Sequence, residues 1–274
     1  MLVIATDLDR TLLPNGTQAY DGSMGIFCEI IKKEKLKLVY VTGRNLRLVK
    51  EAIAEFHTPW PDFIVAEVGT KLYSRSNENF VEDCEWIRQI RSQTRNWDTD
   101  DFQEKLSFIK GLRIQEKDKQ NEFKLSYYID NLENSDVVRR KAAQIIKSVC
   151  EHATIVYSVN ETQNVGLLDI LPKCATKVTG LEYLRKKLGL KKKDIVYCGD
   201  SGNDTLPLTF GYKSIVVRNA IPSVKYAVRD ISSQKGIIYN LYIAEGYGNL
   251  NGYYVSGIIE GLTKFHMISP KYIE

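Results

Sequence analysis

Hydrophobic and polar positions follow two alternating periods in the N-terminal part of the chain. Short, continuous apolar runs at 2–6, 36–41 and 63–66 are typical of buried strands. Between them, apolar residues recur at helical spacing in segments that begin near Ser23 and Asn45, residue types that favour helix N-caps. Strands that alternate with helices predict βαβ units and a parallel sheet.

The pattern changes in the middle of the chain. From about residue 77 to residue 122 the sequence is rich in Glu, Asp, Gln, Arg and Asn. Strand patterns and a helix that begins at Ser135 follow, with the strands at 123–129, 154–158 and 165–170. This grouping predicts an inserted α+β domain with an antiparallel sheet, which would cover the first domain as a lid.

The strand and helix alternation returns after Leu171. A helix pattern begins near Thr176, and apolar strands follow at 194–198 and 214–217. We therefore expect an α/β fold with a doubly wound, mostly parallel sheet, similar to a Rossmann core. Residues 1–76 and 171–274 would form this core, and residues 77–170 would form the inserted α+β cap domain.

Two carboxylates follow the first predicted strand. Asp7 and Asp9 are separated by one residue, so both side chains point to the same side of an extended backbone. Like charges this close need a cation or a shared proton. Ligands of open α/β sheets also bind beyond the carboxyl ends of parallel strands. The pair indicates a metal-dependent site in which one carboxylate attacks and the other handles a proton.

Three further features follow or precede core strands. Thr42-Gly43-Arg44 offers a hydroxyl, a freely turning backbone and a cation, a combination that suits phosphate capture. Gly199-Asp200-Ser201-Gly202-Asn203-Asp204 places two more carboxylates four residues apart. Lys177 lies at a predicted helix start, where a lysine needs a nearby anion. Each feature alone has an ordinary structural interpretation, as a turn, an Asx cap or a surface lysine.

Together these groups predict a Mg²⁺ site. Carboxylate oxygens without histidine or thiolate are the ligands that Mg²⁺ prefers. The chain has three histidines, and none lies beside these motifs, so histidine catalysis is not expected.

Composition narrows the class of protein. The net charge of +4 is too small to indicate a nucleic-acid partner. No apolar run approaches the roughly 20 residues that span a membrane. The five cysteines include no Cys-x-x-Cys pair, which favours reduced thiols in a cytoplasmic protein.

The four motifs, in this order, resemble those of the haloacid dehalogenase superfamily. The insertion between the second and third motifs matches its C2-capped members, subfamily IIB. The sequence looks closest to the sucrose-phosphate phosphatase branch. The similar segments are Ala66–Thr70, Lys124–Tyr127, Leu168–Pro172, Gly199–Asp204 and Val217–Ala220.

This resemblance implies a role for each motif residue. Asp7 would be the nucleophile that forms an aspartyl-phosphate, and Asp9 the general acid and base. Thr42 and Lys177 would hold the phosphoryl oxygens, although Lys173 is a nearby rival for the lysine. The implied Mg²⁺ ligands are Asp7, the Asp9 carbonyl, Asp200 and Asp204. The implied phosphate- and substrate-binding residues are Thr11, Gly43, Arg44, Gly69 and Asn203 in the core, with Lys124 and Ser126 in the cap.

The implied activity is hydrolysis of a phosphorylated sugar or disaccharide, with sucrose 6-phosphate the best single candidate. Mannosyl-3-phosphoglycerate phosphatase is an alternative within the class. A phosphomannomutase-like phosphotransferase and a catalytically idle module that binds a synthase are alternatives of other classes. We expect a small-molecule substrate, a synthase partner as an open option, and a monomer or weak dimer that binds neither nucleic acid nor membrane.

Overall fold

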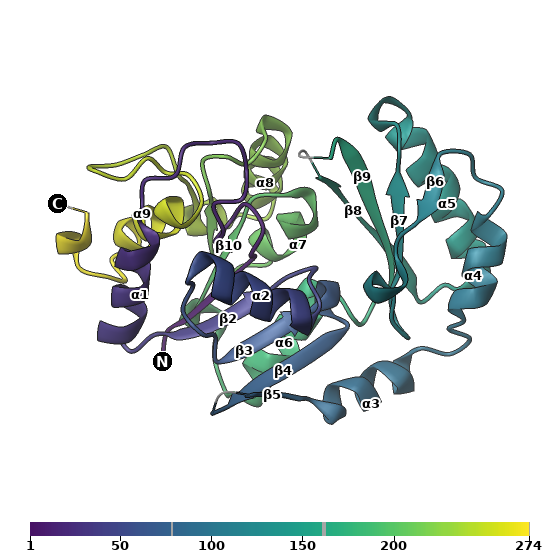
Figure 1. Ribbon diagram of the computed structural model, residues 1–274, viewed down its shortest axis with the longest axis horizontal. Helices are drawn as coiled ribbons and strands as arrows, with labels where there is room; N and C mark the ends of the chain where they lie inside the picture. Colours follow the sequence, from purple (N-terminus) through teal and green to yellow (C-terminus); the bar gives the residue numbers. More distant parts are fainter. Residues whose placement is uncertain (78, 161–162, 274) are drawn as a thin grey trace.

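The computed structural model describes residues 1–77, 79–160 and 163–273, and two sheets are present in that part of the chain (Figure 1). The larger sheet has the strand order β12-β11-β10-β1-β2-β3-β4-β5. Its strands from β12 to β3 are parallel, and β4 and β5 are antiparallel. The strands of this sheet are β1 (Val3–Thr6), β2 (Lys37–Val41), β3 (Phe63–Ala66), β4 (Lys71–Ser76), β5 (Asn79–Glu82), β10 (Ile195–Gly199), β11 (Lys213–Val216) and β12 (Leu241–Ile243).

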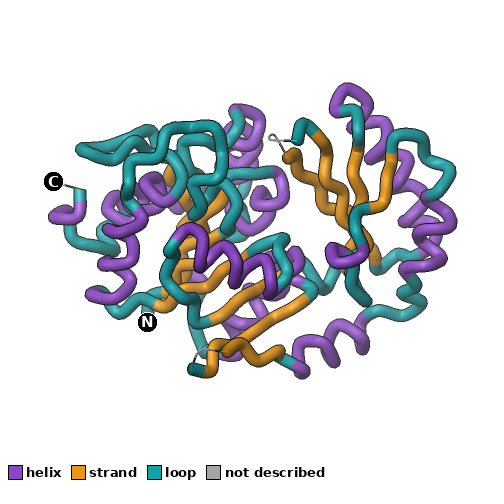
Figure 2. Tube along the Cα trace, in the orientation of Figure 1, coloured by secondary structure: helices purple, strands orange, loops and turns teal. Residues whose placement is uncertain are grey.

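Helices cover both faces of this sheet, which confirms the expected doubly wound α/β core (Figure 2). One apolar cluster joins the sheet to α1 (Met24–Lys33), α2 (Leu46–Phe56) and α9 (Val255–Lys264). The cluster on the other face involves α3 (Cys84–Gln93), α6 (Lys177–Lys187), α7 (Thr205–Leu208) and α8 (Pro222–Gln234). The central strand β1 is buried along its whole length, as its unbroken apolar sequence predicts.

The second sheet is antiparallel, with the strand order β6-β7-β9-β8, and forms the expected α+β cap. Helices α4 (Thr99–Leu106) and α5 (Ser135–Val149) pack on one of its faces through a separate apolar cluster. In Figure 1 this unit lies beside the core, with α3 below. Its strands are β6 (Leu112–Ile114), β7 (Leu125–Ile129), β8 (Ala153–Asn160) and β9 (Val165–Pro172).

The core sheet continues past the expected boundary at residue 77. Strand β5 pairs with β4, and α3 buries Trp86 and Ile90 against the core. Asp83 caps α3 and contacts Lys187 of α6 at 2.6 Å, which fixes this helix to the core. The antiparallel cap sheet begins only at β6. The hydrophilic sequence of this segment does not indicate that α3 packs on the core, because α3 is amphipathic and most of its surface is polar.

The two predicted helix caps differ in outcome. Asn45 caps α2 by accepting a hydrogen bond from the Leu48 N–H. Ser23 precedes α1, but its side chain makes no capping hydrogen bond because its backbone is already helical. Within 1–77, 79–160 and 163–273, no helix has both the length and the apolar character needed to cross a membrane.

Candidate active site

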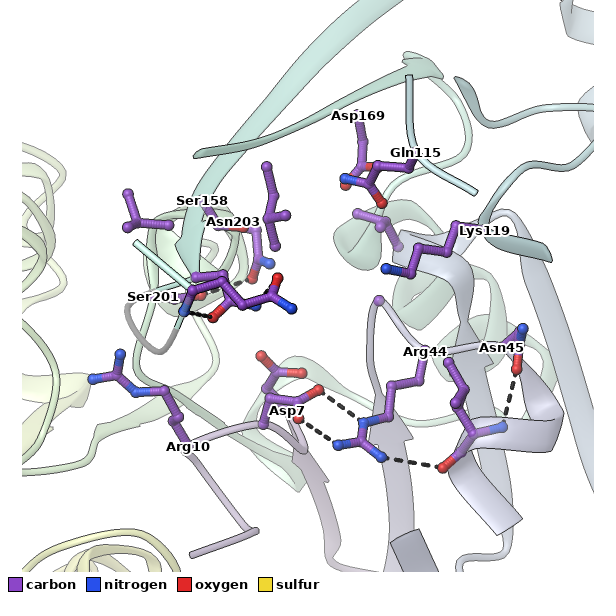
Figure 3. A pocket seen from close by; sticks show the side chains of 18 of the residues that line it. Asp7, Arg10, Arg44, Asn45, Gln115, Lys119, Ser158, Asp169, Ser201 and Asn203 are labelled. Atoms are coloured by element: carbon purple, nitrogen blue, oxygen red, sulfur yellow. Dashed lines mark hydrogen bonds and ion pairs between the residues drawn. The ribbon is translucent and has the colours of Figure 1, made fainter. Parts of the chain in front are cut away.

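A pocket of about 540 Å³ lies between the carboxyl end of the core sheet and the cap (Figure 3). Its core side, here called the pocket floor, includes Asp7, Asp9, Arg10, Arg44, Asp200 and Asn203. Its cap side, here called the pocket roof, includes Gln115, Lys119, Lys124, Tyr128, Ser158 and Asp169.

Asp7 lies at the end of β1, deep in the pocket floor. Its backbone N–H donates to the Cys198 carbonyl at 3.0 Å, so the neighbouring strand β10 fixes its position. The Leu8 N–H donates to Oδ1 at 2.8 Å, and Oδ2 lies 3.0 Å from Lys177 Nζ. Burial raises the pKa of Asp7 well above its ordinary value, although Lys177 opposes this shift. The carboxylate is therefore desolvated, with one oxygen anchored by the backbone and the other by a cation.

Lys177 is the first residue of α6, and its side chain is 2% exposed. Thr176 and Thr179 form a reciprocal capping pair that fixes the start of this helix. The Lys177 ammonium donates to Asp204 Oδ1 and to Asn203 Oδ1, each at 2.8 Å. Burial alone would lower its pKa, but Asp204 and Asp7 raise the pKa above the ordinary value of lysine. Lys177 therefore stays charged inside the site.

Lys173, the rival lysine, lies elsewhere. Its ammonium donates to the Glu151 carbonyl at 2.5 Å, on the surface. The structure thus resolves the two candidates in favour of Lys177 as the lysine that contacts Asp7.

Asp9 is held by two partners. Arg44 donates to it from Nε at 2.9 Å and from the second guanidinium nitrogen at 2.6 Å, and Asn15 donates from Nδ2 at 2.7 Å. Burial alone would raise the pKa of Asp9, but the hydrogen bonds and charge of Arg44 lower it. Arg44, expected at the phosphate, is therefore engaged in a bidentate pair with Asp9.

Asp7, Asp200 and Asp204 form a buried acidic cluster. One oxygen of each lies within 4.8 Å of the others, in the part of the chain that the structure describes. Burial and the charge of Asp204 raise the pKa of Asp200 to about 7. Three buried carboxylates so close, with Lys177 as their shared cation, favour a further cation, and their hard oxygen donors fit Mg²⁺.

Asp204 differs from the other two members of this cluster because each of its oxygens accepts at least two hydrogen bonds. Oδ1 accepts from Lys177 and from the Tyr197 hydroxyl at 2.6 Å. Oδ2 accepts from the backbone N–H groups of Asp200 and Ser201 at 3.3 and 3.2 Å. Asp204 thus ties Lys177 to the loop that carries Asp200.

Asp200 is held less tightly. Its Oδ1 accepts from the Thr11 hydroxyl at 2.9 Å, and its Oδ2 lies 3.6 Å from Arg10 Nε. The carboxylate of Asp9 lies outside the acidic cluster of described residues, so only its backbone carbonyl is considered for a metal.

The remaining core residues from the sequence analysis divide into two groups. Gly43 and Asn203 line the pocket, whereas Thr11, Thr42 and Gly69 lie behind its surface. The Thr42 hydroxyl accepts from the Arg44 N–H at 3.2 Å. Gly69 has φ +108°, and a Cβ there would lie 2.2 Å from the carbonyl carbon and oxygen of Thr176. Gly69 therefore permits the close approach of α6 that places Lys177.

The two cap residues from the sequence analysis also separate. Lys124 lines the pocket and is 5% exposed. Ser126 lies behind the roof surface and donates to Asp169 Oδ1 at 2.5 Å. Ser126 thus orients a residue of the roof.

Several lining residues were missed by the sequence analysis. Asn15 had a local signal, because the Asn15-Gly16 pair favours a turn close to Asp9. No periodicity marked the residues of the cap, because they come from separate strands and turns. The missed residues also include Arg10, Gln115, Lys119, Tyr128, Ser158 and Asp169.

The arrangement of the site agrees with the comparisons with known proteins. The family model described as sucrose-6F-phosphate phosphohydrolase matches residues 1–266. The chain belongs to the sucrose-6F-phosphate phosphohydrolase family. This family consists of sugar-phosphate phosphatases of the haloacid dehalogenase superfamily, so the chain is assigned to the phosphoric monoester hydrolases.

Individual relatives support this family assignment. A putative HAD-like hydrolase of Nitrosococcus oceani is 35% identical over 96% of this chain and 71% of its own length. Probable sucrose-phosphatase 2 of Arabidopsis thaliana is 29% identical over 80% of this chain, which matches about half (51%) of that relative. The sucrose-phosphatase of Synechocystis sp. PCC6803, solved with sucrose and phosphate, superposes with a TM-score of 0.80 at 22% identity, covering 98% of this chain and 99% of that one. This family member shares that fold.

Proposed function

We propose that this family member is a Mg²⁺-dependent phosphatase that hydrolyses a phosphorylated disaccharide, with sucrose 6-phosphate as the preferred substrate. The observation that carries the proposal is the desolvated Asp7 carboxylate, held against Lys177, beneath a pocket with a polar roof. The names of the sucrose-phosphatase relatives support the choice of sugar.

Asp7 is the nucleophile in this proposal. Its oxygen forms a bond to phosphorus as the bond between phosphorus and the sugar oxygen breaks, which gives an aspartyl-phosphate and the free sugar. A carboxylate nucleophile divides one difficult displacement into two easier ones. Lys177, which contacts Asp7 at 3.0 Å, stabilises charge on the phosphoryl oxygens.

Asp9 is the general acid and base in this proposal. It donates a proton to the departing sugar oxygen and later takes one from the water that cleaves the aspartyl-phosphate. Arg44 and Asn15 orient its carboxyl group through three hydrogen bonds. Arg44 favours the ionised form of Asp9, which is the form that takes a proton from water in the second step. In the first step Asp9 must be protonated, so Arg44 must be displaced or share its charge with the substrate phosphate.

The Mg²⁺ ion would be held by Asp7, Asp200 and the Asp9 carbonyl, with Asp204 acting through the loop that it fixes. The ion would supply positive charge to the phosphoryl oxygens. Gly43 and Asn203, which line the pocket, would contribute the remaining phosphate contacts, supported by Thr11 and Thr42 from behind.

The pocket roof fits a sugar as the leaving group. A volume of about 540 Å³ is within the range of roughly 300–1,000 Å³ typical of small-molecule sites. Lys124 brings a cation and Gln115 an amide, and Asp169, oriented by Ser126, brings an acceptor. Sugar hydroxyls donate and accept, so they match such a mixture.

A phosphate-release assay with Mg²⁺ tests the proposal. The panel contains sucrose 6-phosphate, mannosyl-3-phosphoglycerate, hexose phosphates and nucleotides, with Asp7→Asn as the inactive control. The highest kcat/KM is expected for sucrose 6-phosphate, with loss of activity in EDTA. A preference for mannosyl-3-phosphoglycerate would contradict sucrose 6-phosphate as the substrate and identify mannosyl-3-phosphoglycerate instead. A requirement for a sugar bisphosphate activator would indicate a phosphotransferase.

A further inference from the structure

Lys119 is a roof residue that none of the sequence motifs includes. It ends the short turn Lys117–Lys119, and its ammonium group points into the pocket from the cap side (Figure 3). The other cations near the reacting centre have partners there: Lys177 contacts Asp7, and Arg44 contacts Asp9. Lys119 is placed further out, where the part of the substrate beyond the phosphate would lie.

Local hydrogen bonds hold the Lys119 ammonium in one arrangement. Nζ donates to the Tyr128 hydroxyl at 2.5 Å and lies 2.9 Å from Glu116 Oε2. The Tyr128 hydroxyl in turn donates to the same Glu116 carboxylate at 2.9 Å. An ammonium group has three protons, so one remains for a ligand.

The turn that carries Lys119 is fixed to the core. Asn45, the cap of α2, donates from Nδ2 to the Asp118 carbonyl at 3.1 Å. Arg47 donates to the Asp118 carboxylate at 2.9 Å. Gln120 closes the turn from the cap side through hydrogen bonds with the backbone of Gln115 and Ser126. The position of Lys119 therefore depends on the cap being seated on α2.

The charge around Lys119 is balanced. Lys119 pairs with Glu116, and Arg47 pairs with Asp118. The two other charged residues that line the cap side in the described part of the chain, Lys124 and Asp169, carry opposite charges. A formally neutral surface favours an uncharged ligand group over a second anion, because an added carboxylate would leave negative charge uncompensated.

From this geometry we propose that Lys119 is a specificity-determining residue that donates its third proton to a hydroxyl of an uncharged sugar leaving group, and that the contact between Asn45 and Asp118 positions it. The inference rests on the proposed function and deepens it. It adds a cap residue that recognises the sugar, and it makes this recognition depend on the contact between the cap and α2.

The test compares Lys119→Met with Lys117→Met, a matched control in the same turn whose side chain is exposed and does not line the pocket. The measured quantity is kcat/KM for sucrose 6-phosphate divided by kcat/KM for p-nitrophenyl phosphate. Loss of a charge-assisted hydrogen bond should lower this ratio about 10- to 100-fold in Lys119→Met. The ratio should stay within twofold of wild type in Lys117→Met.

The outcomes separate the two proposals. Wild-type protein that releases phosphate from p-nitrophenyl phosphate but from no sugar phosphate refutes the proposed function, and the inference with it. Wild-type activity on sucrose 6-phosphate with an unchanged ratio in Lys119→Met refutes only the inference. A larger loss on mannosyl-3-phosphoglycerate than on sucrose 6-phosphate would overturn recognition of a neutral hydroxyl.

A double-mutant cycle tests the positioning. Asn45→Asp keeps an oxygen to cap α2 but removes the donor to the Asp118 carbonyl and places a carboxylate oxygen against that carbonyl. The ratio should fall about 3- to 10-fold in the wild-type background and change little in the Lys119→Met background. Equal losses in both backgrounds would show that Asn45 acts independently of Lys119.

Discussion

The floor and the roof of the pocket are built on different principles. Floor residues follow β1, β2 and β10, and their charges meet partners across the site, as Asp7 meets Lys177. Roof residues come from a turn and from β7, β8 and β9 of the cap, and they bring amide, hydroxyl and ring groups as well as charges. The floor has the dense, desolvated charge that phosphoryl transfer needs, whereas the roof has the mixed polarity that suits the proposed sugar leaving group. Chemistry and recognition can therefore change separately.

The largest effect is expected at the floor, in Asp7→Asn. This substitution removes the proposed nucleophile at almost constant volume, so turnover should fall to background while the fold is retained. Phosphate release and thermal unfolding measure the two quantities. Undiminished phosphate release by this variant would contradict the proposed role of Asp7.

Asp9→Asn should have the next largest effect. It removes the proposed proton donor and acceptor but keeps a group that can still pair with part of Arg44, so kcat should fall by roughly 10²–10⁴. Single-turnover measurements should show both formation and hydrolysis of the aspartyl-phosphate slowed. A near-normal kcat would mean that water or another residue transfers the proton.

Gly69→Ala tests the support of the floor instead of its chemistry. The added Cβ would lie 2.2 Å from the Thr176 carbonyl, so the start of α6 must shift. We expect a loss of about 3 kcal/mol in the free energy of unfolding, together with reduced kcat because Lys177 moves. Urea titration measures the first quantity. Gly25→Ala is a control, because a Cβ added there would meet no atom within 4 Å outside its own helix.

Lys124→Met tests the roof. Because Lys124 lines the pocket on its cap side, we expect KM for the sugar phosphate to rise about 10- to 100-fold with little change in kcat. A fall in kcat with KM unchanged would place this lysine at the reacting centre, and the separation of floor and roof would fail.

The last prediction concerns the pH dependence of stability, which arises from the charge balance of the floor. Because burial raises the pKa of Asp200 to about 7, the folded protein binds a proton that the unfolded chain releases near pH 4. This stabilisation is present at low pH and is lost as the pH rises to about 7, by up to about 1.4 kcal/mol per pH unit. Thermal unfolding in EDTA should show this pH dependence weakened in Asp200→Asn. Addition of Mg²⁺ should remove it from the wild type, and equal pH slopes in both proteins would contradict it.

The sequence was informative where one short segment contains a whole functional unit. Asp7 and Asp9 follow an apolar strand, and β-strand geometry alone places such residues at the edge of the sheet. Strands β1, β2, β3, β10 and β11 of the core and β7, β8 and β9 of the cap were predicted for the same reason, since their apolar runs are local. Strands β4, β5, β6 and β12 were not predicted.

The sequence was less informative where several segments must meet. Arg44 was expected at the phosphate, but its partner Asp9 lies 35 residues away in sequence, and only the fold shows the pairing. Gly69 was expected to bind substrate, but in the structure a glycine is needed at this position because α6 passes too close for a Cβ atom. Helix α3 was concealed because its contacts with Tyr183 and Lys187 depend on a helix about 100 residues further along the chain.

The capping pair of Thr176 and Thr179 has a consequence for how such enzymes diversify. The cap returns to the core through β9, which ends at Pro172, only a few residues before Lys177. Since the two threonines close the start of α6 with their own hydrogen bonds, the anchoring of the lysine does not depend on what precedes it. We therefore expect that a different cap domain joined before Ala175 would leave Lys177 in place. This junction is a site at which the cap domain can be exchanged to change substrate specificity.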